Sequence, residues 1–174
     1  GSKELSYYGT ATALSVARYY LAGASVGDYA LFGGGTNNKS MFTTVDAYNT
    51  SLTRSTPTAL SAGRFGLAGA SVGDYALFGG GNTGSVSDVV DAYNTSLTRS
   101  TPTALSVGRY SLAGASVGNY ALFGGGTNDK SMFTTVDAYN TSLTRSTPTA
   151  LSAGRFDLAG ASVGNYALFG GGTN

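Results

Sequence analysis

The stretch YALFGGG occupies residues 29–35 and recurs unchanged at residues 75–81, 120–126 and 166–172. Its aromatic and apolar residues favour a β-strand, and the glycines that follow are typical of a turn or bulge where a strand ends. We therefore predict that each copy forms one strand and one turn of a repeated sheet.

The copies are spaced by 46, 45 and 46 residues. A period of about 20 to 50 residues is typical of solenoids, propellers and other repeat arrays. The difference of one residue falls in a single stretch, since residues 82–89 replace the longer stretches at 36–44 and 127–135. A change of length that is tolerated at one place indicates a surface loop.

The sequence also has a second, longer period of 91 residues, because SAGRFGLAG at 61–69 recurs as SAGRFDLAG at 152–160. Duplication of a block of two repeats requires every copy to offer its neighbour the same surface. Gly1 and Ser2 resemble the remnant of a cleaved tag. We expect one domain over residues 1–174, with repeats at about 15–60, 61–105 and 106–151 and a partial repeat at 152–174.

The sequence of each repeat predicts four short strands and no helix. A helical solenoid of similar period is disfavoured, because the repeats carry many glycines and no apolar stripe at helical spacing. Four strands in a period of about 45 residues are typical of a propeller blade, so the predicted fold class is all-β, a β-propeller of four-stranded antiparallel blades. In the second copy the strands cover 63–72, 75–78, 89–93 and 96–101, with tight turns at Gly73-Asp74 and Asn94-Thr95.

The segment LAGAS, first seen at residues 21–25, supplies only small residues after its leucine. Such residues suit the strand nearest the axis of a propeller, where the blades converge and bulky side chains would collide. Larger residues such as Phe78 and Tyr93 are then expected to fill the wider space between blades further out.

The strand count does not reach a whole number of blades. Residues 3–12 are interpreted as a strand of the fourth kind, and the chain ends after a strand of the second kind at Phe169, so one strand is lacking for four blades. An incomplete blade leaves an exposed edge. We predict self-association of two chains head to tail as an eight-bladed homodimer, and the alternative is a closed four-bladed monomer.

Several repeated residues together resemble a kelch repeat. Kelch blades carry an arginine that opens the first strand, glycines that end the second, a tyrosine near the end of the third and a tryptophan in the fourth. The resemblance covers essentially the whole chain and implies a propeller, although the chain has no tryptophan. The matching residues are Arg18, Arg64, Arg109 and Arg155, the four glycine triplets, and Tyr48, Tyr93 and Tyr139, whereas Arg54, Arg99 and Arg145 lie about where the tryptophan is expected.

The repeated VDAYNTSLTRSTPTALS is also similar to tandem repeats of bacterial and phage surface proteins, which implies a bacterial surface or a virion as the location. WD40 blades have a comparable period, but their Gly-His and Trp-Asp signatures require residues that this chain lacks.

The amino-acid composition argues against several classes of function. Histidine and cysteine are absent, which removes imidazole bases, thiol nucleophiles and the commonest ligands of transition metals. Charged residues make up 11% of the chain and the net charge is +1, which gives no electrostatic footprint for nucleic acid or an anionic membrane. We expect no cofactor, no metal, no catalytic residue, no nucleic-acid partner and no membrane partner.

Two groups of side chains remain as candidates for contact with a partner. The loop residues join an exposed lysine to apolar side chains, although the phenylalanines could instead open the third strand and be buried. The arginines could pack over the outer strands, or bind an anionic or sugar ligand. The candidate contact residues are Lys39, Met41, Phe42, Lys130, Met132, Phe133, Arg54, Arg99 and Arg145.

The aspartates Asp46, Asp91 and Asp137 precede the repeated tyrosines by two residues, and we interpret them as structural partners of the repeated arginines. The predicted function is therefore a non-enzymatic repeat scaffold or recognition module that presents loops to a protein or glycan partner. Two alternatives stay open: a designed or excised repeat array with no ligand, and a fragment of a carbohydrate-active enzyme.

Overall fold

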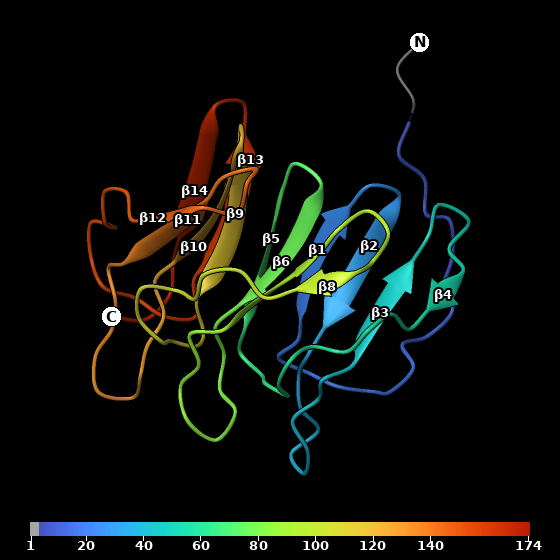
Figure 1. Cartoon of the computed structure of the whole chain (residues 1–174), viewed down its shortest axis with the longest axis horizontal. Coiled ribbons are helices and arrows are strands. Elements are labelled where there is room, and N and C mark those ends of the chain that lie inside the picture. The colour runs from blue at the N-terminus through green and yellow to red at the C-terminus, as the bar shows by residue number, and fades with distance from the viewer. Residues whose placement is uncertain (1–3) are drawn as a thin grey trace.

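Three four-stranded antiparallel sheets and one two-stranded sheet make up the fold of residues 4–174, which are the residues that the computed structural model describes (Figure 1). This confirms the predicted all-β class and the tandem four-stranded sheets. The sheets contain β1 (Ala22–Val26), β2 (Tyr29–Gly33), β3 (Val45–Tyr48) and β4 (Arg54–Ser55); β5 (Ala68–Val72), β6 (Tyr75–Gly79), β7 (Val90–Tyr93) and β8 (Arg99–Ser100); β9 (Ala113–Val117), β10 (Tyr120–Gly124), β11 (Val136–Tyr139) and β12 (Arg145–Ser146); and β13 (Ala159–Val163) and β14 (Tyr166–Gly170).

The predicted turns are confirmed. In the first hairpin Val26 pairs with Tyr29, so the connection is a turn of two residues in which Gly27 has a positive φ of 53°. In the turn between β3 and β4, Asn49 Oδ1 accepts hydrogen bonds from the backbone N–H groups of Ser51 and Thr53, both at 3.0 Å. The repeated asparagines are therefore structural residues of hairpin turns.

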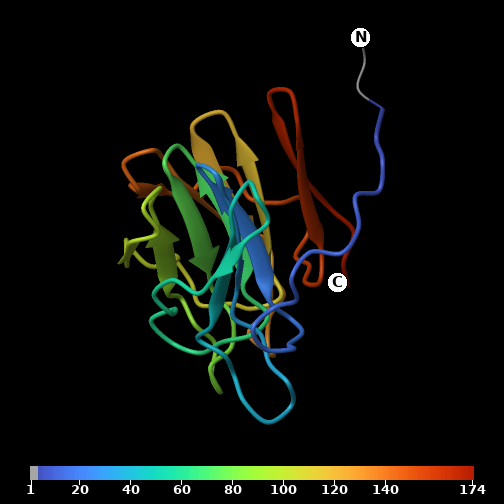
Figure 2. The ribbon, with the colours of Figure 1, turned by 90° about the vertical axis from the view of Figure 1, so that its right-hand side faces the viewer.

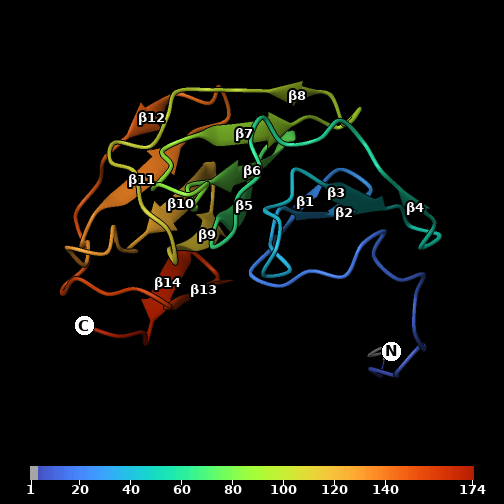
Figure 3. The ribbon, with the colours of Figure 1, turned by 90° about the horizontal axis from the view of Figure 1, so that it is seen from below.

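The sheets pack face to face and fan out from their first strands. β1, β5, β9 and β13 lie side by side, whereas β4, β8 and β12 lie at the periphery (Figure 3). The prediction that the LAGAS segments form the inner strands is confirmed. In Figure 2 the red β13–β14 hairpin lies at one side of the stack.

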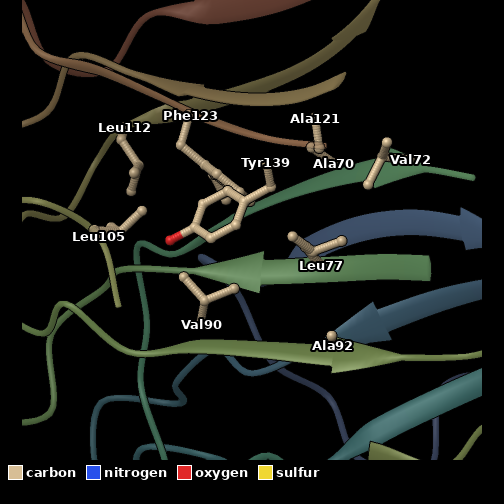
Figure 4. Packing of buried hydrophobic residues seen from close by; sticks show 11 residues of the cluster. Ala70, Val72, Leu77, Val90, Ala92, Leu105, Leu112, Ala121, Phe123 and Tyr139 are labelled. Atoms are coloured by element: carbon tan, nitrogen blue, oxygen red, sulfur yellow. The ribbon is translucent and has the colours of Figure 1, made fainter. Parts of the chain in front are cut away.

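The hydrophobic core lies between successive sheets. Between the second and third sheets, Phe123 and Tyr139 point toward Leu77 and Val90, and all four are buried (Figure 4). Because the side chains of a strand alternate between its two faces, Phe78 and Tyr93 of the second sheet face the other way and join the core shared with the first sheet. The large residues therefore fill the space between sheets, as predicted.

Only the first glycine of each triplet belongs to the strand. Gly34 and Gly35 follow β2 with φ values of 73° and 103°, a region that side chains rarely tolerate. A Cβ on Gly34 would also lie 2.7 Å from the carbonyl oxygen of Arg64 in the next repeat. The triplets thus end the strand, as predicted, and also allow the next sheet to approach.

The prediction that residues 3–12 form a strand is wrong for residues 4–12, which have no strand pairing, and residue 3 lies outside the described residues, as do Gly1 and Ser2. Strands of the fourth kind pair with a third strand of the same sheet, and residues 4–12 have no such neighbour. The described chain therefore has fourteen strands.

Two of the predicted strands are shorter than expected. Gly66 has a φ of 67°, which breaks the extended backbone before Ala68 and leaves Phe65 in an isolated bridge with Asn82. The fourth strands pair over two residues only, because the chain then turns through a proline toward the next sheet. Over residues 4–174 we find no helix that has the length and apolar character to cross a bilayer.

Candidate functional site

Aromatic side chains line up at one end of the sheets, just before the inner strands begin. Backbone bridges from each repeat hold them in place, for example between Tyr110 and Thr127. The ring centroids of Tyr19 and Tyr20 are 4.9 Å apart. The ring centroid of Phe65 lies 6.3 Å from that of Tyr20 and 6.5 Å from that of Tyr110. We call Tyr19, Tyr20, Phe65, Tyr110 and Phe156 the aromatic row.

The position that follows Tyr19, Phe65, Tyr110 and Phe156 differs in every repeat, carrying Tyr20, Gly66, Ser111 and Asp157. Its backbone has a positive φ of 56° to 67° in all four copies. Each N–H donates to the carbonyl oxygen of the same position in the preceding repeat, at 2.9, 2.8 and 2.9 Å. This backbone ladder fixes the position, so the side chain is free to vary without changing the scaffold.

The aromatic row and the variable position line a cavity of about 290 Å³. Its walls are rings of Tyr20, Phe65, Tyr110 and Phe156, and its polar groups come from Ser111 and Asp157. Tyr20 is 64% exposed, so its ring is accessible from solvent. A cavity that combines aromatic walls with a few polar groups has the general character of a ligand site.

A second cavity of about 240 Å³ adjoins the aromatic row and contains residues that the sequence singled out. Lys130 and Met132 line it together with Tyr110 and Phe156. Tyr110 Oη donates a hydrogen bond to Asp129, and this bond, with burial and nearby negative charge, raises the pKa of Tyr110. The structure therefore brings two of the predicted contact residues next to the aromatic row.

The other predicted loop residues differ in their exposure. Lys39 is exposed and Met41 and Met132 are 40% and 44% exposed. Phe42 and Phe133 are half-buried and lie before the third strands, where their backbone groups bond to the glycine triplet and to the next repeat. A contact role for these residues remains a prediction.

The arginines Arg54, Arg99 and Arg145 lie in the outer strands, and each is held by a carbonyl group of a segment outside the sheets and by an aspartate of its own sheet. Arg99 Nη1 donates to the carbonyl oxygen of Ala59 at 2.7 Å, and its Nε lies 3.9 Å from Asp91 Oδ1. Arg54 pairs with Tyr48, at the far end of β3 from the β2–β3 loop. The structure therefore does not place these arginines and the candidate loops at one site, and their predicted contact with a ligand remains a prediction.

Buried ion pairs occupy the same place in each complete sheet. Arg18, Arg64 and Arg109 donate through Nη1 to Asp46, Asp91 and Asp137 at 2.9, 3.0 and 2.9 Å, and all six side chains are inaccessible to solvent. Nη2 of each arginine donates to the carbonyl oxygen of the phenylalanine in the second strand at 2.9 to 3.0 Å. The predicted structural pairing of arginine and aspartate is confirmed.

The ionisation of these pairs follows from burial and from charge. Burial would raise the pKa of Asp46, but the hydrogen bonds from Arg18 and Ser15 and the charge of Arg18 outweigh it, so the pKa is lowered. Burial lowers the pKa of Arg64 and Arg109, and their aspartate partners oppose this effect. A guanidinium stays protonated in proteins, so the buried arginines keep their charge.

The described residues 4–174 contain no group of three or more acidic, histidine or cysteine side chains placed to hold a metal ion. No protein-family model matches the sequence, and no curated protein matches it significantly. The kelch resemblance therefore stands on the repeated arginine, glycine and tyrosine residues alone.

The aromatic row is the part of the site that sequence reasoning missed. The sequence predicts Phe65 within a strand over 63–72, whereas in the structure Phe65 forms an isolated bridge with Asn82 before β5 begins. The signal that marks the aromatic row is the position after the aromatic residue, which changes from Tyr20 to Gly66, Ser111 and Asp157 while the residues around it stay almost constant.

Proposed function

We propose that the chain is a segment of a kelch-like β-propeller and acts as a non-enzymatic recognition module that binds a glycan along the aromatic row. The observation that carries this proposal is the cavity of about 290 Å³ between aromatic rings, with a hydroxyl group and a carboxylate at its wall. Its size is at the small end of ligand pockets, which span about 300–1,000 Å³.

The chemistry of the cavity suits a sugar. Aromatic rings offer flat apolar surfaces on which the C–H faces of a pyranose can pack, and tyrosine adds a polar group at its rim. The Asp157 carboxylate accepts hydrogen bonds from sugar hydroxyl groups, and the Ser111 hydroxyl both donates and accepts them. The adjoining Lys130 and Met132 extend the contact surface, in keeping with the predicted role of that loop.

The use of the carboxylates supports recognition over catalysis. Glycoside hydrolysis generally needs two carboxyl groups on either side of the scissile bond. Asp46, Asp91 and Asp137 are fully buried in ion pairs, so they are out of reach of a bound sugar. Of the other carboxylates, Asp157 lines this cavity, and Asp129, which lines the adjoining cavity, accepts the hydrogen bond of Tyr110.

Variation between the repeats supports a ligand over a ligand-free array. An array kept only for its shape has no reason to change the same position in every copy. The four copies nevertheless carry tyrosine, glycine, serine and aspartate at the position that faces the cavity. Different side chains on a constant backbone are what a site needs to recognise an asymmetric ligand.

A glycan array followed by titration of the best sugar tests the proposal. We expect saturable binding that Phe65→Ala weakens about fivefold, since a lost aromatic contact is worth about 1 kcal/mol. Tyr120→Ala is the control, because it removes an exposed tyrosine at the opposite, hairpin end of the sheets. No binding on the array, or equal loss in both variants, would count against the aromatic row.

A further inference from the structure

The three interfaces between successive sheets are built from the same contacts, and the outer faces of the first and last sheets carry the two halves of that contact. We infer that a second copy of this chain binds head to tail, with the face of its first sheet (β1–β4) seated on the open face of the β13–β14 hairpin. The inference is independent of glycan binding.

In the first part of the contact, the phenylalanine ring of one sheet packs against the first glycine of the triplet in the preceding sheet. The phenyl ring of Phe78 lies 3.1 Å from the place that a Cβ on Gly33 would take, and the corresponding distance from Phe123 to Gly79 is 3.2 Å. Phe78 and Phe123 are completely buried, whereas Phe32 at the open face of the first sheet is 38% exposed. Gly170, its counterpart at the far end, has no atom within 4 Å of that place.

Leucines of the second strands show the same difference. Leu31 and Leu77 are 1% and 0% exposed because the next sheet covers them, whereas Leu168 in β14 is 53% exposed. On the open face of the first sheet, an apolar groove of about 740 Å³ lies around Phe32. Its walls include Leu14, Leu21, Ala30 and Leu52. Each end therefore exposes the apolar residues that internal sheets bury.

Backbone groups at the two ends are matched in the same way. Gly35, Gly81 and Gly126 each donate an N–H to an arginine carbonyl oxygen of the next repeat, at 2.8, 2.9 and 2.8 Å. In residues 4–174 the N–H of Gly172 makes no such bond, and neither does the carbonyl group of Arg18. The ladder at the variable position likewise ends with the N–H of Tyr20 and the carbonyl group of Asp157.

Serines of the inner strands provide a third set of matched groups. Ser71 Oγ donates to the Ser25 carbonyl oxygen at 2.7 Å and accepts the Ser25 N–H at 3.1 Å, and Ser116 and Ser162 are linked in the same manner. A second copy would set its Ser25 hydroxyl beside the backbone of Ser162.

These contacts favour a head-to-tail arrangement over a symmetric face-to-face one. The phenyl ring on one face needs the glycine on the other, and each backbone donor needs an acceptor from the opposite end. An interface of two unlike faces is heterologous, and it closes into a ring or continues as a chain of copies according to its rotation. In either case the aromatic row continues from Phe156 into Tyr19 of the second copy.

The mass in solution is the first test, by light scattering on a sizing column. We expect at least twice the 17.5 kDa of one chain. Gly170→Val should raise the dissociation constant at least tenfold and leave the secondary structure unchanged, because the new side chain meets no atom within its own chain. Ser146→Val is the control, since it adds the same side chain to an exposed residue of β12. A mass of one chain at millimolar concentration would overturn the inference.

Cross-linking tests the direction of association, because the chain has no cysteine. Chains carrying Ser25→Cys and chains carrying Ser162→Cys are oxidised separately and after mixing. A disulfide that forms efficiently only in the mixture supports the head-to-tail contact. Efficient cross-linking of either variant with itself, or no enrichment in the mixture, contradicts it.

Discussion

Arg64 and Asp91 form an ion pair that solvent does not reach: Nη1 lies 3.0 Å from Oδ2, and neither side chain is exposed. Asp91 also accepts hydrogen bonds from the backbone N–H and the hydroxyl group of Ser61, at 3.1 and 3.0 Å. Ser61 lies in the segment that connects the first sheet to the second. The pair therefore fastens the connecting segment, the second strand and the third strand of one sheet to each other.

Removal of one member of this pair should be costly. We expect Asp91→Ala to lower the free energy of unfolding by about 3–5 kcal/mol, because it leaves the Arg64 charge buried without a partner. The measurement is equilibrium unfolding in urea. Arg155→Ala is the matched control, since Arg155 occupies the same place in the last repeat and has no carboxylate partner in residues 4–174. Its expected cost is below about 1 kcal/mol.

Acidic pH should lower the free energy of unfolding, because Asp46 becomes protonated and its ion pair is lost. The folded pKa of Asp46 is lowered, so its ion pair stabilises the fold above the unfolded pKa of about 3.9 and this contribution is lost as the pH falls through the folded pKa. We expect the free energy of unfolding to decrease below about pH 4, and Asp46→Asn to show a smaller decrease. Urea titrations at several acidic pH values measure this. An unchanged acid limb in the variant would rule out Asp46 as a contributor.

The repeat period predicted most of the fold. Turn residues such as Gly27 and Asn49 interact only with residues a few positions away in the chain, so the turns they form can be predicted from the local sequence. The length of β4 and the lack of a strand at residues 4–12 were not predictable in this way. Both depend on which neighbour is available for pairing, and that is settled by packing between sheets.

The candidate site was predicted only in part. Lys130 and Met132 belong to the loop predicted to contact a partner, and they line a cavity. The rings of Phe65 and Phe156 are separated by two repeats in the sequence, and they come near each other only because the inner strands pack side by side. A local pattern does not contain that proximity.

Alkaline pH should lower the free energy of unfolding, because the buried tyrosines of the third strands are stable in the fold only when protonated. Burial, followed by the charge of Asp91, raises the pKa of Tyr93 well above its usual value. The stability from the protonated tyrosine is therefore complete below the unfolded pKa of about 10 and is lost as the pH rises through the folded pKa. We expect Tyr93→Phe to cost about 1 kcal/mol at neutral pH, because the 2.7 Å hydrogen bond to the Thr58 carbonyl oxygen is lost.

The same variant should show a flatter decline of stability above about pH 10, measured by unfolding in urea alongside the ultraviolet absorbance of tyrosinate. Tyr7→Phe is the control, because Tyr7 is 86% exposed in the N-terminal segment. Equal alkaline declines in the two variants would show that Tyr93 does not carry the effect.

The contact between Phe123 and Gly79 predicts a dependence of one residue on the other. A Cβ on Gly79 would lie 3.2 Å from the Phe123 ring, so Gly79→Ala overpacks the interface and should cost about 1–3 kcal/mol. In a Phe123→Leu background the shorter side chain leaves room for the new methyl group, and we expect the added cost of Gly79→Ala to fall below about 1 kcal/mol. Urea unfolding of the wild type, both single variants and the double variant gives the coupling energy. Strict additivity would mean that the ring and the glycine do not share one packing site, and the repeated interface between sheets would then depend on other contacts.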